Sequence, residues 1–361
     1  MNAWKDPFGS NRLALWLADR SDRKQGRISR IAARWGWLTP LGERGKVVWV
    51  MAGADRNSVR LAVELIRAIR EKRLDIRLIL TYEQEYPDLL ILLDDCDKTG
   101  WGLAPSDHPL ALARAMERLG PYGIIVVNTH PRPNLSKLLA GQKRVLVVNP
   151  PLAVDFSCER IYNDRTGNDS TADMQAILAQ AQIDPNFKSL ISQGTERHLW
   201  WLHGASAETS SALAEQQLSR DANDIVFVSG LRPLKDSLAI STWDRSPITS
   251  GRVVWIDDEK WLPAISAAVT ATHFAHIDPV VLWQAMAGGA AVSCAEQDEL
   301  PKPALRAAVI ACGDPLPLWQ NYRANPILTR QAGDNARRLF WQERRQAEIE
   351  SQELVTRVFE W

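Results

Sequence analysis

The sequence has no apolar run of 18 residues, and it opens without the long apolar stretch and small-residue cleavage site of a secretory signal. We therefore expect a cytoplasmic protein. Cysteine is scarce, and Cys96, Cys158, Cys294 and Cys312 lie far apart, without the paired spacing of a zinc site. Because the cytoplasm disfavours disulfides, we expect all four to be small core residues.

Net charge is also missing, since 43 Lys and Arg residues balance 43 Asp and Glu residues. This balance argues against general nucleic-acid binding. No acidic pair has convincing ligand spacing, so we expect neither a metal nor a separate cofactor. What is present is a globular composition, with 45% hydrophobic residues in a chain of 361. That length is natural for two domains.

The charge balance fails in residues 1–46, which hold ten Lys and Arg against four Asp and Glu. Apolar side chains, Trp16, Leu17 and Trp35 among them, interleave with these basic residues. Such a segment can lie on an anionic membrane surface. It can equally be a solvated helix face whose apolar side packs on the protein. We treat residues 1–45 as a leader on or near the first domain, with both interpretations open.

Short apolar runs then alternate with stretches of helical periodicity. The pattern predicts strands at 46–52, 76–81, 123–127 and 144–148, and a short one at 89–93. It predicts helices at 58–71, 109–119 and 135–139. Continuous apolar strands separated by helices indicate a parallel sheet that is covered on both faces.

A polar stretch at 163–171 predicts a loop, after which the alternation restarts. Strands are predicted at 198–202, 225–228, 253–256, 271–274 and 290–293, and helices at 207–218, 262–269, 280–287 and, long and charged, 329–358. Two doubly wound α/β sheets in tandem with a long final helix are typical of the GT-B fold. We expect domains at 46–190 and 191–328, a helix at 329–361 crossing back, and a ligand at the carboxyl ends of the strands, between the domains.

Four segments resemble the bacterial 3-deoxy-D-manno-octulosonic acid (Kdo) transferases. The first is VWVMAGADRNSVRLAVELIRAIRE, residues 48–71, where the family has a strand, a Gly-Glu turn and a helix. The family's glutamate, its proposed general base, falls on Asn57 or Ser58, and neither side chain takes up a proton at neutral pH. Asp55 is the nearby carboxylate, which can replace the base or cap the helix.

The second segment, VVNTHPRPNLSKLL (residues 126–139), is similar to the family's E-T-E-x-W-P-N-L. Asn128 and His130 replace the two glutamates, and Arg132 replaces the tryptophan. A histidine after a strand suits proton transfer, although it can also serve as a hydrogen-bonding fixture. In the third segment, residues 145–162, Pro151 takes the place of the family's arginine, which loses a donor for anionic groups.

The fourth resemblance lies in the second half of the chain. LWWLHGASAETSSALAEQQL, residues 199–218, resembles the opening of the family's nucleotide domain, and the Arg-Pro of FVSGLRPLKD, residues 227–236, matches its R-H-P. In HIDPVVLWQAMAGGAAVSC, residues 276–294, Gln284 replaces a glutamate that holds the donor's ribose in many GT-B enzymes. Gly288 and Gly289 let the backbone approach a nucleotide closely, or they form an ordinary helix C-cap.

The resemblance implies a cytoplasmic-face glycosyltransferase acting in lipopolysaccharide-like or capsular glycan synthesis. It would use a nucleotide sugar, possibly CMP-linked, and a lipid or saccharide acceptor. The candidate catalytic residues are Asp55 and His130, and the candidate acceptor-binding residues are Arg34, Asn57, Ser58, Asn128 and Arg132. The candidate donor-binding residues are Ser206, Ser229, Arg232, His276, Asp278, Gln284, Gly288 and Gly289. The replaced catalytic positions keep two alternatives open: a non-catalytic GT-B partner in glycan assembly, and a nucleotide-sugar epimerase.

Overall fold

A computed structural model of the chain describes residues 6–40, 44–162, 172–182, 184, 187, 198–230, 252–256 and 258–361. It divides into an N-terminal domain, Met1–Met174 with Gln346–Trp361, and a C-terminal domain, Gln175–Arg345. The boundary therefore lies earlier than the expected residue 190. The reason is that Ala176, Ala179 and Phe187 pack into the core of the C-terminal domain.

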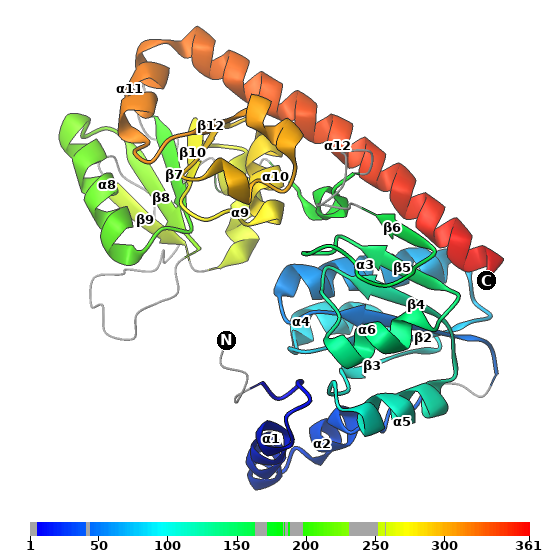
Figure 1. The fold of residues 1–361 in the computed structure, drawn as a ribbon. Coiled ribbons are helices and arrows are strands. Elements are labelled where there is room, and N and C mark those ends of the chain that lie inside the picture. The colour runs from blue at the N-terminus through cyan, green and yellow to red at the C-terminus, as the bar shows by residue number, and fades with distance from the viewer. Residues whose placement is uncertain are drawn as a thin grey trace. The chain divides into compact units, whose positions relative to one another are not determined.

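The N-terminal domain is built around a parallel sheet with the strand order β3-β2-β1-β4-β5-β6 (Figure 1). Its strands are β1 (Val47–Ala52), β2 (Arg77–Tyr82), β3 (Thr99–Leu103), β4 (Pro121–Val127), β5 (Val145–Val148) and β6 (Arg160–Tyr162). Its helices are α1 (Arg12–Lys24), α2 (Ile28–Arg34), α3 (Arg56–Lys72), α4 (Pro87–Leu90), α5 (Pro109–Leu119) and α6 (Pro133–Ala140), with a 3-10 turn at Ile91–Leu93.

Side chains of alternate strand residues fill the two faces of this sheet. Trp49, Ile79 and Ile124 point into one core, together with side chains of α5 and α6. Because successive strand residues face opposite ways, Val48 and Val50 point to the other face, and α3 packs against β1, β2 and β4. The continuous apolar strands of the sequence are thus explained by burial on both faces.

The C-terminal domain contains a second parallel sheet with the strand order β12-β11-β10-β7-β8-β9. Its strands are β7 (Leu199–His203), β8 (Ile225–Ser229), β9 (Arg252–Ile256), β10 (Ala271–Phe274), β11 (Ala291–Cys294) and β12 (Val309–Ala311). Its helices are α8 (Ala207–Arg220), α9 (Leu262–Ser266), α10 (Pro279–Gly288), α11 (Leu316–Ala324) and the first part of α12 (Pro326–Glu360). Short 3-10 turns lie at Met174–Leu178, Glu259–Trp261, Gln297–Glu299 and Pro303–Ala307.

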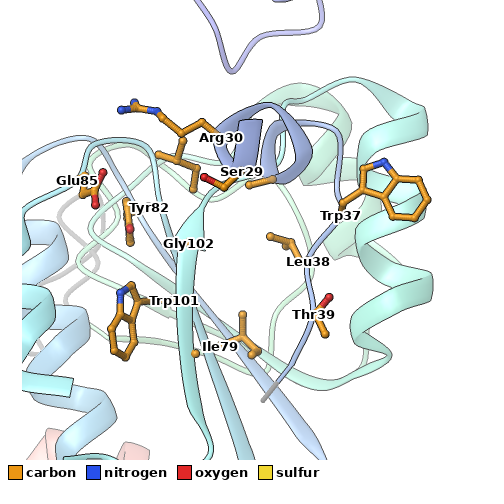
Figure 2. A pocket seen from close by; sticks show the side chains of 13 residues that line it. Ser29, Arg30, Trp37, Leu38, Thr39, Ile79, Tyr82, Glu85, Trp101 and Gly102 are labelled. Carbon is orange, nitrogen blue, oxygen red and sulfur yellow. The ribbon is translucent and has the colours of Figure 1, made fainter. Parts of the chain in front are cut away.

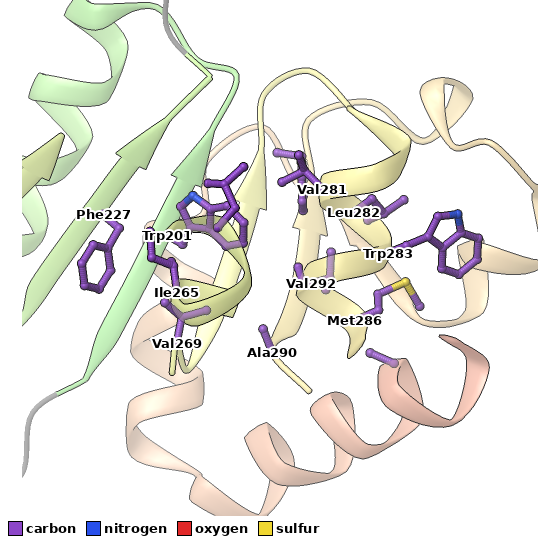
Figure 3. Close-up of a cluster of buried hydrophobic side chains, with 14 of the residues drawn as sticks. Trp201, Phe227, Ile265, Val269, Val281, Leu282, Trp283, Met286, Ala290 and Val292 are labelled. Carbon is purple, nitrogen blue, oxygen red and sulfur yellow. The ribbon is translucent and has the colours of Figure 1, made fainter. Parts of the chain in front are cut away.

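Two neighbouring tryptophans serve the two cores of this domain. Trp201 packs with Phe227 and with residues of α9 and α10 on one face of the sheet (Figure 3). Trp200 packs on the other face against Trp319 of α11, with ring centroids 4.9 Å apart and planes 13° from parallel. Both tryptophans are fully buried core residues.

Three local predictions need correction. The short strand expected at 89–93 is helical, because Pro87 opens a turn at its first position. Strand β3 was missed because its sequence, TGWGL, lacks a continuous apolar run. Of the four cysteines only Cys294 is buried, whereas the other three are half-buried.

The leader forms α1 and α2 and belongs to the N-terminal domain. Arg34 is 3% exposed and pairs with the carboxylates of Asp19 and Asp22. Trp35 donates its indole N–H to Asp19 at 2.7 Å. Leu13, Trp16 and Leu17 are about half exposed, on the outer face of α1. Within the described parts of the chain, no helix has both the length and the apolar character needed to cross a membrane.

Candidate functional site

Polar side chains collect where β1 and β4 of the N-terminal sheet end. Asp55 follows β1, caps α3 by accepting the backbone N–H of Ser58 at 2.8 Å, and remains exposed to solvent. Asn128 follows β4 and reaches the same carboxylate at 3.3 Å. Asn128 has φ 45°, a left-handed conformation that asparagine tolerates better than most residues. The capping interpretation of Asp55 is thus confirmed, and its outward position leaves it accessible.

Ser58 is a structural residue of this edge. It is fully buried, accepts the N–H of Gly53 at 2.7 Å and donates to the carbonyl of Val127 at 2.8 Å. These bonds tie the turn after β1 to the end of β4. Because both the proton and the oxygen of Ser58 are engaged, the structure does not offer this hydroxyl to a ligand. Asn57, one residue earlier, is half-buried.

His130 is exposed and lines two small cavities of about 40 and 270 Å³. It forms no hydrogen bond with any residue that the structure describes. The described contacts therefore do not support a role as a hydrogen-bonding fixture. Asn134 of the Pro-Asn motif donates its side-chain amide to the Asp107 carbonyl at 2.8 Å, so that this part of the family resemblance has a structural role.

Arg132 is held by two carboxylates, Glu83 at 3.1 Å and Asp6 at 3.2 Å. Burial lowers the pKa of Arg132, but the hydrogen bond to Glu83 and the charges of both acids outweigh burial and raise the pKa overall. Sequence reasoning missed Glu83. Its position directly after β2 was the available signal, because residues that follow parallel strands share one edge of the sheet. Arg34, buried with its two aspartates, is not brought to this edge.

The C-terminal domain has a cavity of about 570 Å³ at the carboxyl ends of β7, β8 and β9 and the start of α10. Gly204 and Gly230 line it with φ 76° and 77°, conformations that favour glycine. A Cβ at Gly204 would lie 2.8 Å from the His276 carbonyl, and one at Gly230 would lie 2.8 Å from the His203 ring. Glycine is therefore required for these two turns to approach so closely.

Asp278 caps α10 beside this cavity, accepting the N–H groups of Val280 and Val281 at 2.9 and 3.2 Å. His276 is exposed at the cavity's rim, 3.4 Å from Glu299. Ser206 caps α8, accepting the Thr209 N–H at 3.1 Å. The capping contacts explain why a polar residue precedes each of these two helices. His276 and Asp278 line the cavity, whereas Ser206 does not.

Ser229 and His203 form the cavity's buried polar wall, and His203 was missed by sequence reasoning. The Ser229 oxygen accepts the indole N–H of Trp201 at 2.7 Å and lies 2.9 Å from His203 Nδ1. Since an indole only donates, Ser229 is the acceptor toward Trp201, and its hydroxyl also shares a hydrogen bond with Nδ1 of His203. Nε2 has no hydrogen-bond partner among the described residues. Burial lowers the pKa of His203 to about 4, although Asp278 opposes the shift.

The remaining donor-side candidates lie elsewhere. Gln284 is buried on α10 and does not line the cavity. Gly289 caps the far end of α10 with φ 80°, and a Cβ at Gly288 would lie 1.8 Å from the Ser266 carbonyl. The two glycines thus take the C-cap and packing roles. Arg232 lies outside the described residues.

We expect the C-terminal domain to lose stability as the pH falls from about 6.5 to 4. Burial lowers the pKa of both His203 and His273 to about 4 from an ordinary 6.5. In this window the unfolded chain binds protons that the folded domain excludes, so each group removes up to about 1.4 kcal/mol per pH unit. Urea unfolding followed by tryptophan fluorescence would measure this. His273→Gln should flatten the pH dependence relative to the wild type, and an unchanged slope would contradict the prediction.

No protein-family model matches the sequence, and no curated protein sequence matches it significantly. Solved structures do resemble its fold. CalG4, the calicheamicin glycosyltransferase, superposes with a TM-score of 0.57 and 10% identity over 86% of this chain and 98% of its own. The UDP-GlcNAc 2-epimerase from Neisseria meningitidis bound to UDP-GlcNAc superposes with a TM-score of 0.54 and 11% identity, over 86% of this chain and 100% of its own. The glycotransferase of kitacinnamycin superposes with a TM-score of 0.52 and 9% identity, over 86% of this chain and 99% of its own.

At these identities the likeness concerns the fold alone. The two six-stranded parallel sheets and the long final helix are the architecture of GT-B glycosyltransferases, with two Rossmann-like domains. The fold class expected from the sequence is thus confirmed. The same architecture also occurs in an epimerase, so the fold alone does not identify the reaction.

Proposed function

Because the chain has the GT-B fold, we propose that it is a glycosyltransferase that moves a sugar from a nucleotide donor to a lipid or saccharide acceptor. The observation that carries this proposal is the C-terminal cavity, where the glycine turns after β7 and β8 meet the start of α10. Asp278 already accepts the first N–H groups of α10, so the buried imidazole of His203 is the polar group that we assign to the nucleotide. A volume of about 570 Å³ is within the range of small-molecule sites.

In this proposal the N-terminal edge binds the acceptor, and Asp55 accepts the proton of the attacking hydroxyl. The support is that Asp55 is exposed and that Asn128 orients it. His130 is the alternative base. Asn57 and Arg132 are candidate acceptor contacts, since Asn57 lies two residues after Asp55 and Arg132 lies two residues after His130. In the C-terminal cavity, His203 contacts the donor nucleotide and Ser229 holds the His203 ring, with His276 and Asp278 in the same lining. Arg232 remains a candidate donor-binding residue. The Kdo-like chemistry, the CMP-linked donor and a role in envelope glycan synthesis belong to this proposal through the sequence resemblance.

Nucleotides test the proposal directly. CMP, UDP or one of their sugars should raise the melting temperature of the whole protein, because a ligand that binds only the folded state stabilises it by mass action. His203→Ala should weaken binding about tenfold or more, the loss expected for a hydrogen bond to a charged group. His273→Ala is the matched control, since His273 is also buried and bonded to a serine but does not line the cavity.

The same experiment separates the alternatives. If none of these nucleotides shifts the melting temperature, the donor site is contradicted and a non-catalytic partner in glycan assembly is favoured. A nucleotide sugar that binds and is epimerised without any acceptor would favour the epimerase. The first alternative is supported by the replaced family positions Asn57, Asn128, Pro151 and Gln284. The second is supported by the shared architecture alone.

We also propose that α1 rests on an anionic membrane surface. Its outer face exposes Leu13, Trp16 and Leu17, and Arg20, whose guanidinium lies 5.4 Å from the Trp16 ring centre, is one of several exposed basic residues nearby. Apolar side chains can enter the headgroup region while the cations meet anionic lipids. A peripheral position of this kind would suit a lipid acceptor.

Co-sedimentation with vesicles tests this surface. The full chain should bind vesicles of phosphatidylcholine and phosphatidylglycerol, bind pure phosphatidylcholine less, and release as salt rises. The double variant Trp16→Ser with Leu17→Ser should lose most of this binding. Trp341→Ser is the control, because Trp341 is exposed to a similar extent, 56% against 53% for Trp16, on the C-terminal domain. Equal binding by all three proteins would contradict the proposal.

A further inference from the structure

The C-terminal cavity lacks a fixed positive charge. Among the lining residues that the structure describes, the acids are Glu259 and Asp278, and there is no lysine or arginine. Three hollows of the N-terminal domain each carry a cation: Arg30 in the hollow beside β3 (Figure 2), and Arg132 and Lys137 in the two hollows next to His130. A phosphate in the C-terminal cavity would therefore find a positive partner in the described lining only where a histidine takes up a proton.

Two histidines line this cavity, and one of them is buried in its wall. The side chain of His276 is 79% exposed at the rim, 3.4 Å from Glu299, so water and salt would screen a charge on its ring. His203 is 7% exposed. Because opposite charges attract more strongly in a buried place of low dielectric constant, a proton on His203 would contribute more to the binding of a phosphate.

A glycine keeps one edge of the His203 ring uncovered. A Cβ at Gly230 would lie 2.8 Å from Cε1 and 3.1 Å from Nε2 of this ring, so a side chain at that position would crowd the edge. Gly230 lines the cavity together with His203. Nε2 is therefore the ring nitrogen that a ligand oxygen can reach.

Ser229 can serve the His203 ring in either protonation state. Its oxygen accepts the indole N–H of Trp201 and keeps a second lone pair, 2.9 Å from Nδ1 of His203. Toward a neutral ring the hydroxyl can donate or accept, and toward a ring with two protons the second lone pair accepts the Nδ1–H. A second proton on His203 therefore leaves no unpaired donor on the side of Ser229.

In the free protein the His203 ring is neutral. Burial lowers the pKa of His203 to about 4, and the charge of Asp278 opposes this shift without overcoming it. The other titratable groups of the cavity are Glu259 and His276, and the ring packed beside His203 is the uncharged Phe274. A phosphate at Nε2 would add a second negative charge to that of Asp278 and would raise the pKa of His203.

We propose that the phosphate of the donor nucleotide binds His203 as the imidazolium, so that one proton enters the site from solution together with the donor. The inference rests on the proposed function in taking the ligand of this cavity to be a nucleotide. In the complex, Nε2–H donates to a phosphate oxygen and Nδ1–H donates to Ser229. Because binding and proton uptake are linked, the affinity for the donor rises as the pH falls.

Calorimetry on the full chain measures this proton directly. UDP-GlcNAc and CMP-Kdo are the probes, because their esterified phosphates neither gain nor lose a proton near neutral pH, and uridine and cytidine are the matched compounds without phosphate. Titrations at about pH 6.5 in two buffers of different ionisation heat should show uptake of close to one proton with a nucleotide sugar and none with a nucleoside. The affinity for the nucleotide sugar should rise by up to about tenfold for each unit that the pH falls between about 8 and 6.

His203→Gln separates the proton from the hydrogen bond. A glutamine N–H can still donate to a phosphate oxygen, but the amide cannot take up a proton. The variant should bind the nucleotide sugar more weakly, without proton uptake and without a rise in affinity at lower pH. His273→Gln is the matched control, because His273 is also buried and lies 3.1 Å from the Ser293 hydroxyl but does not line the cavity. It should keep the proton uptake of the wild type.

The outcomes separate this inference from the proposed function. A wild type that binds a nucleotide sugar without taking up a proton would overturn the inference and leave the donor site standing. Proton uptake that persists in His203→Gln would also overturn it, whereas a structural role of His203 alone would change the affinity and not the number of protons. If neither nucleotide sugar binds, the proposed donor site and the inference are contradicted together.

Discussion

Replacing Asp224 by alanine should lower the free energy of unfolding of the C-terminal domain by about 3–5 kcal/mol. Asp224 is fully buried and accepts the indole N–H of Trp200 at 2.7 Å, the amide of Gln217 at 2.7 Å and the guanidinium of Arg323 at 2.9 Å. Alanine would leave the indole of Trp200 and the amide of Gln217 buried without this acceptor, whereas Arg323 is 29% exposed and keeps its ion pair with Asp221. An unsatisfied buried donor costs its desolvation, which exceeds the net value of the bond that is lost.

Urea unfolding of the whole protein would measure this loss. Asp221→Ala is the control, because Asp221 pairs with the same arginine but is 24% exposed. Water can replace that partner, so we expect a change of about 1 kcal/mol or less. Asp224→Asn should fall between the two, since an amide oxygen can still accept but carries no charge. A loss at Asp224→Ala no larger than that at Asp221→Ala would contradict the prediction.

Asp55→Asn should reduce sugar transfer by about 10²- to 10⁴-fold, the usual contribution of a general base. Asparagine caps helices about as well as aspartate, so the contact with the Ser58 N–H can be kept while the ability to accept a proton is lost. The thermal midpoint should therefore change little, and so should its shift on nucleotide binding, because Asp55 belongs to the N-terminal domain. Release of nucleotide from the best-binding nucleotide sugar, with an oligosaccharide acceptor, would measure turnover.

His130→Gln is the companion variant, because His130 is the alternative base. A small effect of His130→Gln beside a large effect of Asp55→Asn would assign the proton to Asp55, and the reverse pattern would assign it to His130. Ser136 is buried near the start of α6 and donates to the carbonyl of Pro131. Ser136→Ala therefore controls for disturbance of the loop between β4 and α6. Unchanged turnover in both Asp55→Asn and His130→Gln would exclude both residues as the base.

The elements of secondary structure could be predicted well where the local pattern is strong. The run KVVWVMA predicts β1, and the apolar period after it predicts α3. β3 escaped because two glycines interrupt its five residues, and edge pairing with β2 supplies what its own sequence lacks. Residues 89–93 were wrongly predicted as a strand, because a short apolar run does not show whether its period is that of a strand or a helix. The preceding proline, Pro87, starts a helix there.

The candidate site could be predicted in part. Asp55, Asn128 and His276 were found through the family resemblance, and each lies shortly after a strand, where such positions share one edge of a parallel sheet. Ser58 and Gly288 were also named, yet each serves packing, since Ser58 bridges two strand ends and Gly288 lies against α9. His203 was missed because only the pairing of β7 with β8 brings Ser229 to its ring.

By itself the sequence determined the two α/β halves, the order of most strands and helices, and the replacement of the Kdo transferase positions. These depend on residue types and on local periodicity, which are properties of short segments. The tertiary structure decided which polar side chains are accessible and which are engaged in helix caps and ion pairs. Those properties depend on contacts between segments far apart in the chain, such as Arg132 with Glu83, and a single sequence holds no record of such contacts.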